Sequence, residues 1–483
     1  MGAVVVRSYF AQYPASTFDR CDVACVTIDM LPDVALLEIF DFYPREDDDI
    51  GANWYTLVHV CRKWRNVVFA SPRRLNLRLY CGIGTPVRET LGVWPRLPIV
   101  VWAHLEEITS RDRWRVENIV AALEHNDRIC EIDIPTPNLE DVLPALQQPF
   151  PALTRIWLGG QDVTAPVIPT SFLGGSAPSL RTLILTRIPF PGLPKLLSSA
   201  THLVSLTLWK IPHSGYISPE AMVACLSVLT RLKALEIRFL SPQSRPDRKS
   251  RRPPPPTRVL LPALTCLWFE GVSEYLEDLV ARTDAPLLKN LWITFFHQLI
   301  FDTPQLTQFI RRTPKLAGKT HDEARVFFSK SNASVVLSPQ TLRGALELEI
   351  SCKDSDWQLS SLAQVCNSCL AVIPAVERLY IQGEYSPPIW QRDVENSQWL
   401  ELLQSFTAVK GLYISWEFAP RIAPAMQELA GERVMEVLPA LQTLFFEEPI
   451  PSESGLVRES IGQFVAARQL ASQPIAVFRW ERS

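Results

Sequence analysis

Short segments in which apolar and polar residues alternate recur along most of the chain. Most copies contain the phrase Pro-x-Leu-x-x-Leu-x-Leu or a variant of it, and neighbouring copies begin about 23 to 33 residues apart. Copies with the proline span residues 150–158, 177–185, 261–269, 285–293, 373–381 and 438–446, and copies without it span residues 201–208, 230–237 and 407–414. Alternation with a period of two predicts a short strand whose second and third apolar residues point into a core. Proline cannot donate to a sheet ladder, so its place fits the start of a strand.

Segments with the apolar spacing of a helix lie between these strands. They span residues 218–229, 273–282, 303–312, 359–372, 397–406 and 423–438. One such unit cannot bury its apolar face alone, so stacked units are expected to form a curved parallel sheet lined outside by helices. The period and the phrase resemble leucine-rich repeats. The expected fold class is therefore α/β, with an irregular leucine-rich-repeat solenoid. An ordinary doubly wound α/β sheet is the alternative, and the recurrence of one phrase argues against it.

The repeat-like region is expected to span residues 75–483, with two irregular places. Residues 241–257 are rich in proline and arginine, and they contain too few apolar residues to pack, so a disordered insertion is expected there. The long interval between residues 288 and 345 contains two strand-like segments of a degenerate unit, 321–329 and 332–338. Further strands are expected at residues 75–82, 97–103, 129–135 and 475–480.

A different pattern precedes the repeats. Leu31-Pro32-Asp33 stands before an apolar run that contains Leu36, Leu37, Ile39 and Phe40. Asp33 places a negative charge in the first helical turn, where the helix dipole favours it. Farther along, apolar residues recur at three- and four-residue spacing, which predicts one apolar helix face made of Leu57, Val60, Cys61, Trp64 and Val68.

At these residues the segment resembles an F-box. The resemblance covers residues 27–74, after an N-terminal extension of residues 1–26, and it includes Val60-Cys61-Arg62-Lys63-Trp64 as well as the Leu-Pro-Asp start. An ordinary helical hairpin is the alternative, and it would match the periodicity but not all of these motifs at once. One departure is the segment at residues 43–53, which is longer and more acidic than the usual turn between the first two F-box helices.

The resemblance implies a non-catalytic substrate-recognition subunit of an SCF-type cullin–RING ubiquitin ligase. In such proteins the F-box docks on a Skp-family adaptor, and through it on a cullin, while the repeats hold the client protein. The residues implied for adaptor binding are Leu31, Pro32, Leu36, Leu37, Ile39, Phe40, Leu57, Val60 and Trp64. Some of these must form the F-box core instead. Two alternatives remain: an F-box scaffold that acts outside ubiquitination, and an enzyme that carries a repeat fold.

Composition narrows the class of partner. The 483 residues include 48 Lys and Arg against 51 Asp and Glu, and a net charge of −3 gives no whole-chain attraction to nucleic acid or to an anionic membrane. Neither is expected as a partner. The 10 cysteines are scattered, and no signal peptide is recognised at the start, so reduced thiols in the cytoplasm or nucleus are expected. The sequence contains no uninterrupted run of about 18 apolar residues, so no membrane span is expected.

Motifs for catalysis, cofactors or metals are weak. Gly318-Lys319-Thr320 is similar to the end of a P-loop, but Thr313 stands where the leading glycine belongs. Cys366 and Cys369 have the spacing of half a zinc site, yet no second pair matches it, and buried helix thiols are favoured. The chain is therefore predicted not to be an enzyme and to need no cofactor or metal. The basic cluster within residues 245–252 fits a solvated loop or a nuclear localisation patch.

The residue between the two inward-facing apolar positions of each strand should face outward. Five units carry Trp or Tyr there: Trp157, Trp268, Trp292, Tyr380 and Tyr413. Trp and Tyr are typical anchors of protein interfaces, so these residues are predicted to bind the client. Neighbouring strands lie about 4.8 Å apart, which predicts a continuous aromatic column. Packing of the rings on each other or on other segments is the alternative. Glu236, Glu270 and Glu447 near the column favour a basic client.

Overall fold

The computed structural model forms two compact units, Met1–Arg78 and Leu79–Ser483. The sequence-based boundary between the F-box-like and repeat-like regions lies at residues 74 and 75. The structure describes residues 28–42, 53–82, 85–103, 113–135, 139–160, 166–246, 257–296, 301–317, 322–338, 346–352, 355–370, 373–383, 395–431, 433–447 and 454–480.

The first unit consists of short helices. They are η1 (Ile28–Met30), α1 (Asp33–Asp41), α2 (Asn53–Val60) and α3 (Arg62–Ala70). Leu36, Val58 and Val68 are fully buried and bring the three α-helices together. The ring of Phe40 meets the edge of Trp64 at a centroid distance of 4.8 Å. Arg74 ties α1 to the end of the unit by ion pairs of 2.6 Å to Glu38 and 2.8 Å to Asp41.

The single apolar face expected from Leu57 to Val68 is wrong, because the chain breaks between two helices. Cys61 has extended backbone angles, and its Sγ accepts a hydrogen bond of 3.4 Å from the backbone N–H of Trp64. A thiol thus takes the N-cap position that Ser or Asp commonly fills. The break leaves Val60 exposed at the end of α2, whereas Val68 lies in the core.

The second unit is built on a 16-stranded sheet among the residues described. Its strands are β1 (Leu79–Cys81), β2 (Ile99–Trp102), β3 (Ile129–Ile134), β4 (Arg155–Gly159), β5 (Thr182–Thr186), β6 (Ser205–Ile211), β7 (Ala234–Phe239), β9 (Cys266–Gly271), β11 (Asn290–Phe296), β12 (Glu323–Phe328), β13 (Asn332–Ser338), β14 (Leu346–Ser351), β15 (Arg378–Gly383), β16 (Gly411–Ile414), β17 (Thr443–Glu447) and β18 (Ala476–Trp480). The strands expected at both ends of the repeat-like region, from β1 to β3 and at β18, are therefore confirmed. A separate two-stranded sheet pairs β8 (Val259–Leu260) with β10 (Thr283–Asp284).

The expectation of an all-parallel sheet is wrong at one place. The order of strands is β11-β14-β13-β12-β15, and β13 runs antiparallel to both β12 and β14. After β11 the chain passes over two positions in the sheet, forms β12 beside β15, and returns through β13 to β14 beside β11. The degenerate unit inferred from residues 321–338 is this reversal. All other pairings of the large sheet are parallel among the residues described.

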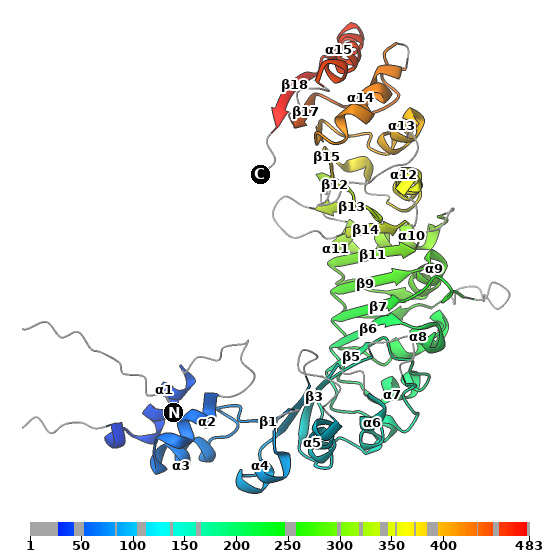
Figure 1. Cartoon of the computed structure of the whole chain (residues 1–483). Coiled ribbons are helices and arrows are strands. Elements are labelled where there is room, and N and C mark those ends of the chain that lie inside the picture. Colours follow the sequence, from blue (N-terminus) through cyan, green and yellow to red (C-terminus); the bar gives the residue numbers. More distant parts are fainter. Residues whose placement is uncertain are drawn as a thin grey trace, which may run out of the picture. The chain divides into compact units, whose positions relative to one another are not determined.

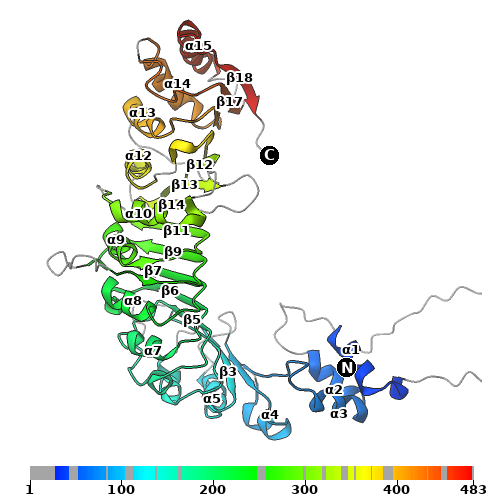
Figure 2. The ribbon, with the colours of Figure 1, turned by 180° about the vertical axis from the view of Figure 1, so that it is seen from behind.

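Helices lie along one face of the sheet (Figures 1 and 2). They are α4 (Val87–Val93), α5 (Arg113–Leu123), α6 (Leu139–Val142), α7 (Leu193–Ser199), α8 (Pro219–Leu226), α9 (Ser273–Ala281), α10 (Pro304–Arg312), α11 (Pro314–Ala317), α12 (Gln358–Cys369), α13 (Asn396–Gln404), α14 (Ala419–Glu428) and α15 (Ser454–Leu470). Short 3-10 helices add η3 (Ala145–Gln147), η4 (Phe172–Gly175), η5 (His213–Gly215), η6 (Ser355–Trp357) and η7 (Ile373–Ala375). Between helices and sheet lies a core of strand residues such as Leu183, Leu206 and Leu235, each at most 1% exposed.

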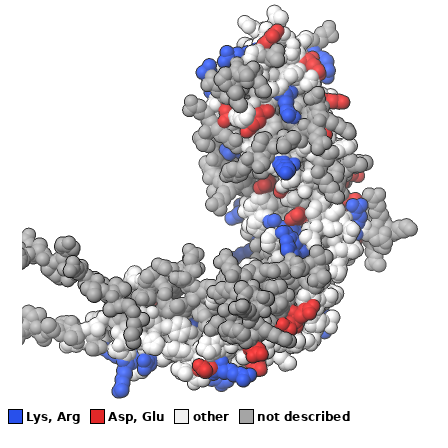
Figure 3. All heavy atoms as spheres, in the orientation of Figure 1, with Lys and Arg blue, Asp and Glu red and all other residues white. Residues whose placement is uncertain are grey.

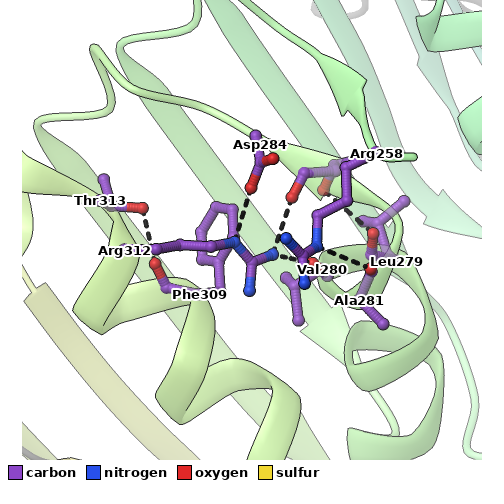
Figure 4. Close-up of polar contacts among 9 residues, drawn as sticks. Arg258, Leu279, Val280, Ala281, Asp284, Phe309, Arg312 and Thr313 are labelled. Carbon is purple, nitrogen blue, oxygen red and sulfur yellow. Dashed lines mark hydrogen bonds and ion pairs between the residues drawn. The ribbon is translucent and has the colours of Figure 1, made fainter. Parts of the chain in front are cut away.

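Neighbouring helices α9 and α10 cap each other. Buried Glu277 of α9 accepts hydrogen bonds from the backbone N–H groups of Gln305 (2.9 Å) and Leu306 (2.7 Å) at the start of α10. In return, Arg312 at the end of α10 donates to the carbonyl oxygen of Val280 at the end of α9. It also donates to the carbonyl oxygen of Thr283 in β10 and to Asp284 at 2.6 Å (Figure 4). These charges match the helix dipoles, which favour an anion at the N-terminus and a cation at the C-terminus. The two helices are therefore held in one register along the sheet.

Replacing Glu277 by Ala is expected to lower the free energy of unfolding by about 1–3 kcal/mol, because two buried N–H groups lose their acceptor. Glu277→Gln should lose less, since its side chain keeps one acceptor oxygen. Urea unfolding followed by circular dichroism measures both. Glu401→Ala, at an exposed position of α13, is the control and should change stability by less than about 0.5 kcal/mol. Equal effects at the two positions would contradict the capping role.

The structure describes only part of the segment predicted to be a disordered insertion, residues 241–257. Residues 247–256 lie outside the described residues. Ser244, in contrast, is fully buried, and its backbone N–H donates to the carbonyl of Ser241 at 3.2 Å. The packed part of the unit therefore extends beyond β7 into the start of this segment.

Candidate functional site

One outward-facing side chain from each of 14 strands falls on a single line across the sheet, which we call the outward row. In strand order it consists of Asp133, Trp157, Ile184, Thr207, Glu236, Trp268, Trp292, Glu347, Val336, Arg325, Tyr380, Tyr413, Phe445 and Phe478. Arg325 and Phe478 are exposed, and the other members are partly buried. Because strand side chains alternate between faces, the helices cover the opposite face. All five aromatic residues predicted for client binding lie on this row.

The aromatic rings form two separate stacks. Trp268 and Trp292, the tryptophan pair, are parallel within 3° at a centroid distance of 4.3 Å. The C-terminal stack consists of Tyr380, Tyr413, Phe445 and Phe478, with successive centroid distances of 4.2, 4.2 and 5.4 Å. The continuous column expected from the sequence is wrong, because β14, β13 and β12 place Glu347, Val336 and Arg325 between the stacks. Trp157 stands apart, since its register partners are Asp133 and Ile184.

The chain itself covers part of the C-terminal stack. Trp480 of β18 meets the edges of Tyr380 and Tyr413 at centroid distances of 5.9 and 5.7 Å. Arg325 lies 5.3 Å from the Tyr380 ring, and its Nε donates to Glu323 at 2.6 Å. Burial, followed by the charges of Glu323 and Tyr413, raises the pKa of Tyr380 to about 12, so this phenol is neutral at pH 7. In the C-terminal stack, the rings therefore pack on each other and on a terminal segment, which is the alternative stated from the sequence.

Stacking within the C-terminal stack should be measurable as a coupling energy. For Tyr413→Ala and Phe445→Ala, whose rings are parallel within 1° at 4.2 Å, a double-mutant cycle is expected to give about 0.5–1.5 kcal/mol. The cycle is measured by urea unfolding of the two single variants and the double variant. The control pair Tyr413 and Trp157 lies on distant strands and should be additive within about 0.5 kcal/mol. Additive behaviour of the stacked pair as well would contradict this interpretation.

A small cavity lies beside the tryptophan pair. It has a volume of about 140 Å³, and its lining includes Arg238, Thr294, Glu347 and Glu349 together with both indoles. Such a volume has room for several water molecules. Thr294 Oγ1 donates to Glu349 at 3.1 Å, which orients that carboxylate on the same face.

Among the described residues, carboxylates outnumber basic side chains around the cavity. Glu236 and Glu270 stand next to it on β7 and β9, so four carboxylates including Glu347 and Glu349 surround the indoles. Arg238 forms an ion pair of 2.6 Å with Glu236. The pKa of Glu270 is raised chiefly by burial; Glu349 and Glu236 raise it further, while Arg238 and Lys210 oppose the shift. On the face shown in Figure 3, acidic and basic side chains are interspersed.

The small helical unit separates the residues implied for adaptor binding into three groups. Leu36, Leu37, Phe40 and Leu57 are buried in its core, Leu31 and Trp64 are partly buried, and Pro32, Ile39 and Val60 are exposed. Further exposed apolar side chains, which the sequence reasoning did not select, are Ile28, Met30, Val34 and Phe42. They occupy positions outside the Leu-Leu and Ile-Phe motif, so the motif alone could not reveal them.

The remaining sequence motifs gain no support as sites of chemistry. Cys366 is buried in α12, and the side chain of Cys369 lies outside the described residues, as does Gly318-Lys319-Thr320. Burial raises the pKa of the Cys81 thiol to about 11, which keeps it protonated at neutral pH. Within the described ranges no group of three or more His, Cys, Asp or Glu residues has the arrangement of a metal site. None of the helices in those ranges is long and apolar enough to span a membrane.

No protein-family model matches this sequence, and no curated protein matches it. Among solved structures, the chain is similar to the leucine-rich repeat-containing protein LegL7 from Legionella pneumophila. Sequence identity is 13%, the TM-score is 0.27, and the match covers 70% of this chain and 90% of that chain. A likeness this distant carries no argument about function. The α/β solenoid assignment rests on the chain's own mostly parallel sheet and on the helices that line one face of it.

Proposed function

We propose that this chain is a non-catalytic substrate-recognition subunit of an SCF-type cullin–RING ubiquitin ligase. In this proposal the first unit docks on a Skp-family adaptor, and the outward row of the second unit binds the client protein. The observation that carries it is the separation within the F-box-like motif. Leu36, Leu37 and Phe40 make a core, while Ile39 and Val60 of the same motif remain exposed on the described surface.

Exposed apolar side chains on so small a unit favour a protein partner. Ile28, Met30, Val34 and Phe42 add to the exposed apolar surface, and large groups of such residues commonly mark protein interaction sites. The unit needs Leu36 and Leu37 for its own core, so the exposed residues are the ones free to serve an interface. This supports adaptor docking through α1, the end of α2 and the segment around η1.

The second unit supplies a long sheet face with aromatic anchors for the client. Trp and Tyr are enriched at the energetic centres of interfaces, and the tryptophan pair combines two such rings with a cavity. Holding a client there would act by raising its effective concentration beside the ligase. No reaction on this chain is required for that role.

Affinity purification tests the proposal. The full chain and a variant lacking residues 27–74 are expressed with the same tag, and the proteins that co-purify are quantified by mass spectrometry. The Skp-family adaptor and a cullin are expected with the full chain only. Recombinant adaptor mixed with the purified chain should form a complex on size exclusion. Failure to recover the adaptor in both experiments would contradict the proposal.

The same experiment separates the alternative, an F-box scaffold outside ubiquitination. A scaffold would recover the adaptor without a cullin, whereas a ligase subunit recovers both. Proteasome inhibition should increase the amount of client recovered only for the ligase subunit, because only then is the bound client degraded.

A further inference from the structure

The C-terminal end of the large sheet exposes part of a side-chain layer that is buried on the preceding strands. β18 is the last strand of the sheet among the described residues, and it pairs there with β17 alone. On the side that faces the helices, Leu412 and Leu444 are fully buried, whereas Val477, the register partner of Leu444, is 48% exposed. The described part of the chain therefore leaves the inward face of β18 partly uncovered.

A cavity of about 440 Å³ lies beside this face, at the end of the second unit that carries α15 and β18 (Figure 1). We call it the C-terminal cavity. α15 contributes Val457, Ile461 and Val465, which follow at four-residue spacing along one side of the helix. Phe446 of β17 and Val477 of β18 add further apolar surface. The volume falls within the range of about 300–1,000 Å³ that is typical of binding sites.

The charged side chains among the described lining of the C-terminal cavity are both arginines, Arg458 of α15 and Arg479 of β18. That lining contains no carboxylate. Arg458 is exposed and forms no ion pair within the described ranges. An apolar group next to an acidic group is therefore the complement of this site. A second copy of the chain would bring two further arginines to the same place, so its charge disfavours self-association there.

The outer edge of β18 adds main-chain groups to the site. The backbone N–H of Ala476 donates to the carbonyl of Gln442, just before β17, at 2.9 Å. Main-chain groups of successive residues along a strand point to opposite sides, so those of Val477 point away from β17. β18 reads Ala-Val-Phe-Arg-Trp, without the proline or lysine that commonly protects an exposed edge. This edge therefore suits the addition of an extended segment as one more strand.

We propose that an extended segment of a partner protein pairs with β18, places a large apolar side chain in the C-terminal cavity and pairs an acidic side chain with Arg458. Side chains at alternate positions of the added strand share a face, so the apolar and acidic residues are two positions apart. The fork of donors on arginine fits a carboxylate with two bonds. This site is distinct from the tryptophan pair, and the inference goes beyond the proposed function without depending on it.

Fluorescence anisotropy with the full chain and a fluorescein-labelled, amidated peptide tests the proposal. The probe is Ser-Asp-Val-Phe-Val-Asp-Ser, in which an acid lies two positions from the phenylalanine on either side, so it fits a parallel or an antiparallel strand. It is expected to bind saturably. Versions with asparagine for both acids, or with alanine for the phenylalanine, should bind at least fivefold more weakly.

Backbone methylation of the peptide tests strand addition directly. Methyl groups on the nitrogens of the two valines block one edge of the extended peptide, and methyl groups on those of the phenylalanine and both acids block the other edge. Only one edge of an added strand faces β18. One of the two methylated peptides is therefore expected to lose binding, while the other keeps it.

Variants of the chain supply the second arm. Arg458→Glu is expected to weaken binding of the acidic peptide at least tenfold and to favour the version with lysine for both acids. The matched control, Arg311→Glu at an exposed position of α10, makes the same charge change and should alter neither affinity. Val477→Lys should also remove binding, while the melting temperature stays within a few degrees because this side chain is half exposed.

Absence of saturable binding, equal binding of the acidic and asparagine peptides, or equal losses from both methylated sets would each overturn the proposal. A dimer of the peptide-free chain in sedimentation, converted into a monomer by Val477→Lys, would assign the edge to a second copy instead. Recovery of the adaptor does not bear on these outcomes, because the peptides are mixed with the purified chain alone.

Discussion

Replacing Ile39 and Val60 together by lysine is expected to abolish adaptor binding while the first unit stays folded. Their side chains are 46% and 54% exposed, so a lysine at either position reaches solvent in the free protein. In a complex the same lysine would place a charge in an apolar contact, which is costly unless it is paired. Interface anchors commonly contribute about 2 kcal/mol or more, equivalent to roughly 30-fold in affinity for each. Isothermal titration of the purified chain with the Skp-family adaptor measures the loss.

Two variants show whether the loss comes from the interface. Thr56→Lys adds a charge at an exposed position of α2 and should leave adaptor affinity unchanged. Leu36→Lys buries a charge at a position with no exposed surface, so it should remove binding by unfolding the unit, visible as rapid proteolysis before residue 79. Adaptor affinity within a few-fold of the original in the Ile39 and Val60 double variant would reject the assigned surface.

Replacing both members of the tryptophan pair by alanine is expected to remove client capture and leave adaptor binding intact. Both rings stand on the outward row and are partly exposed, so the leucine core beneath them stays covered by the helices. The stacked rings line the cavity and offer an apolar contact beside its carboxylates. Quantitative crosslinking and mass spectrometry, with and without proteasome inhibition, compare the proteins captured by the double variant and by the original chain.

A matched aromatic control lies on the same sheet. Trp209 of β6 is 38% exposed, and Trp209→Ala should reduce capture little because it stands away from the cavity. Unfolding of the double variant, seen as a collapse of the melting temperature, would show that the pair belongs to the core. An unchanged set of crosslinked proteins would show that clients bind elsewhere.

The sequence pattern predicted the strands well because each strand's burial depends on its own alternation. Leu183 and Leu185 point inward and Ile184 outward as the period of two requires. Strand direction, by contrast, is not encoded in this alternation. The apolar and polar pattern of β13 is the same for a parallel and for an antiparallel strand. The expected continuous aromatic column failed for a different reason, because the three strands between the stacks carry Glu347, Val336 and Arg325 on the outward row.

The N-terminal unit shows a second limit of pattern reading. The three- and four-residue spacing from Leu57 to Val68 continues across Cys61, although the helix does not. Helical spacing therefore could not show that Val60 is exposed while Leu57 is buried. Which residues of the motif are buried and which are exposed depends on how three short helices pack. Such packing is a tertiary property that helical spacing does not show.

The reversal through β12, β13 and β14 also bears on how the solenoid assembles. In a simple repeat array each unit contacts its sequence neighbours, so folding can spread from one repeat to the next. Here β12 lies beside β15, and the chain returns through β13 to fill the place beside β11 with β14. The strands β12, β13 and β14 therefore connect the N-terminal and C-terminal parts of the sheet. Because β15 pairs with β12, we expect the C-terminal strands to join the sheet only after β12, β13 and β14 have formed, and we expect partial unravelling to stop at these three strands.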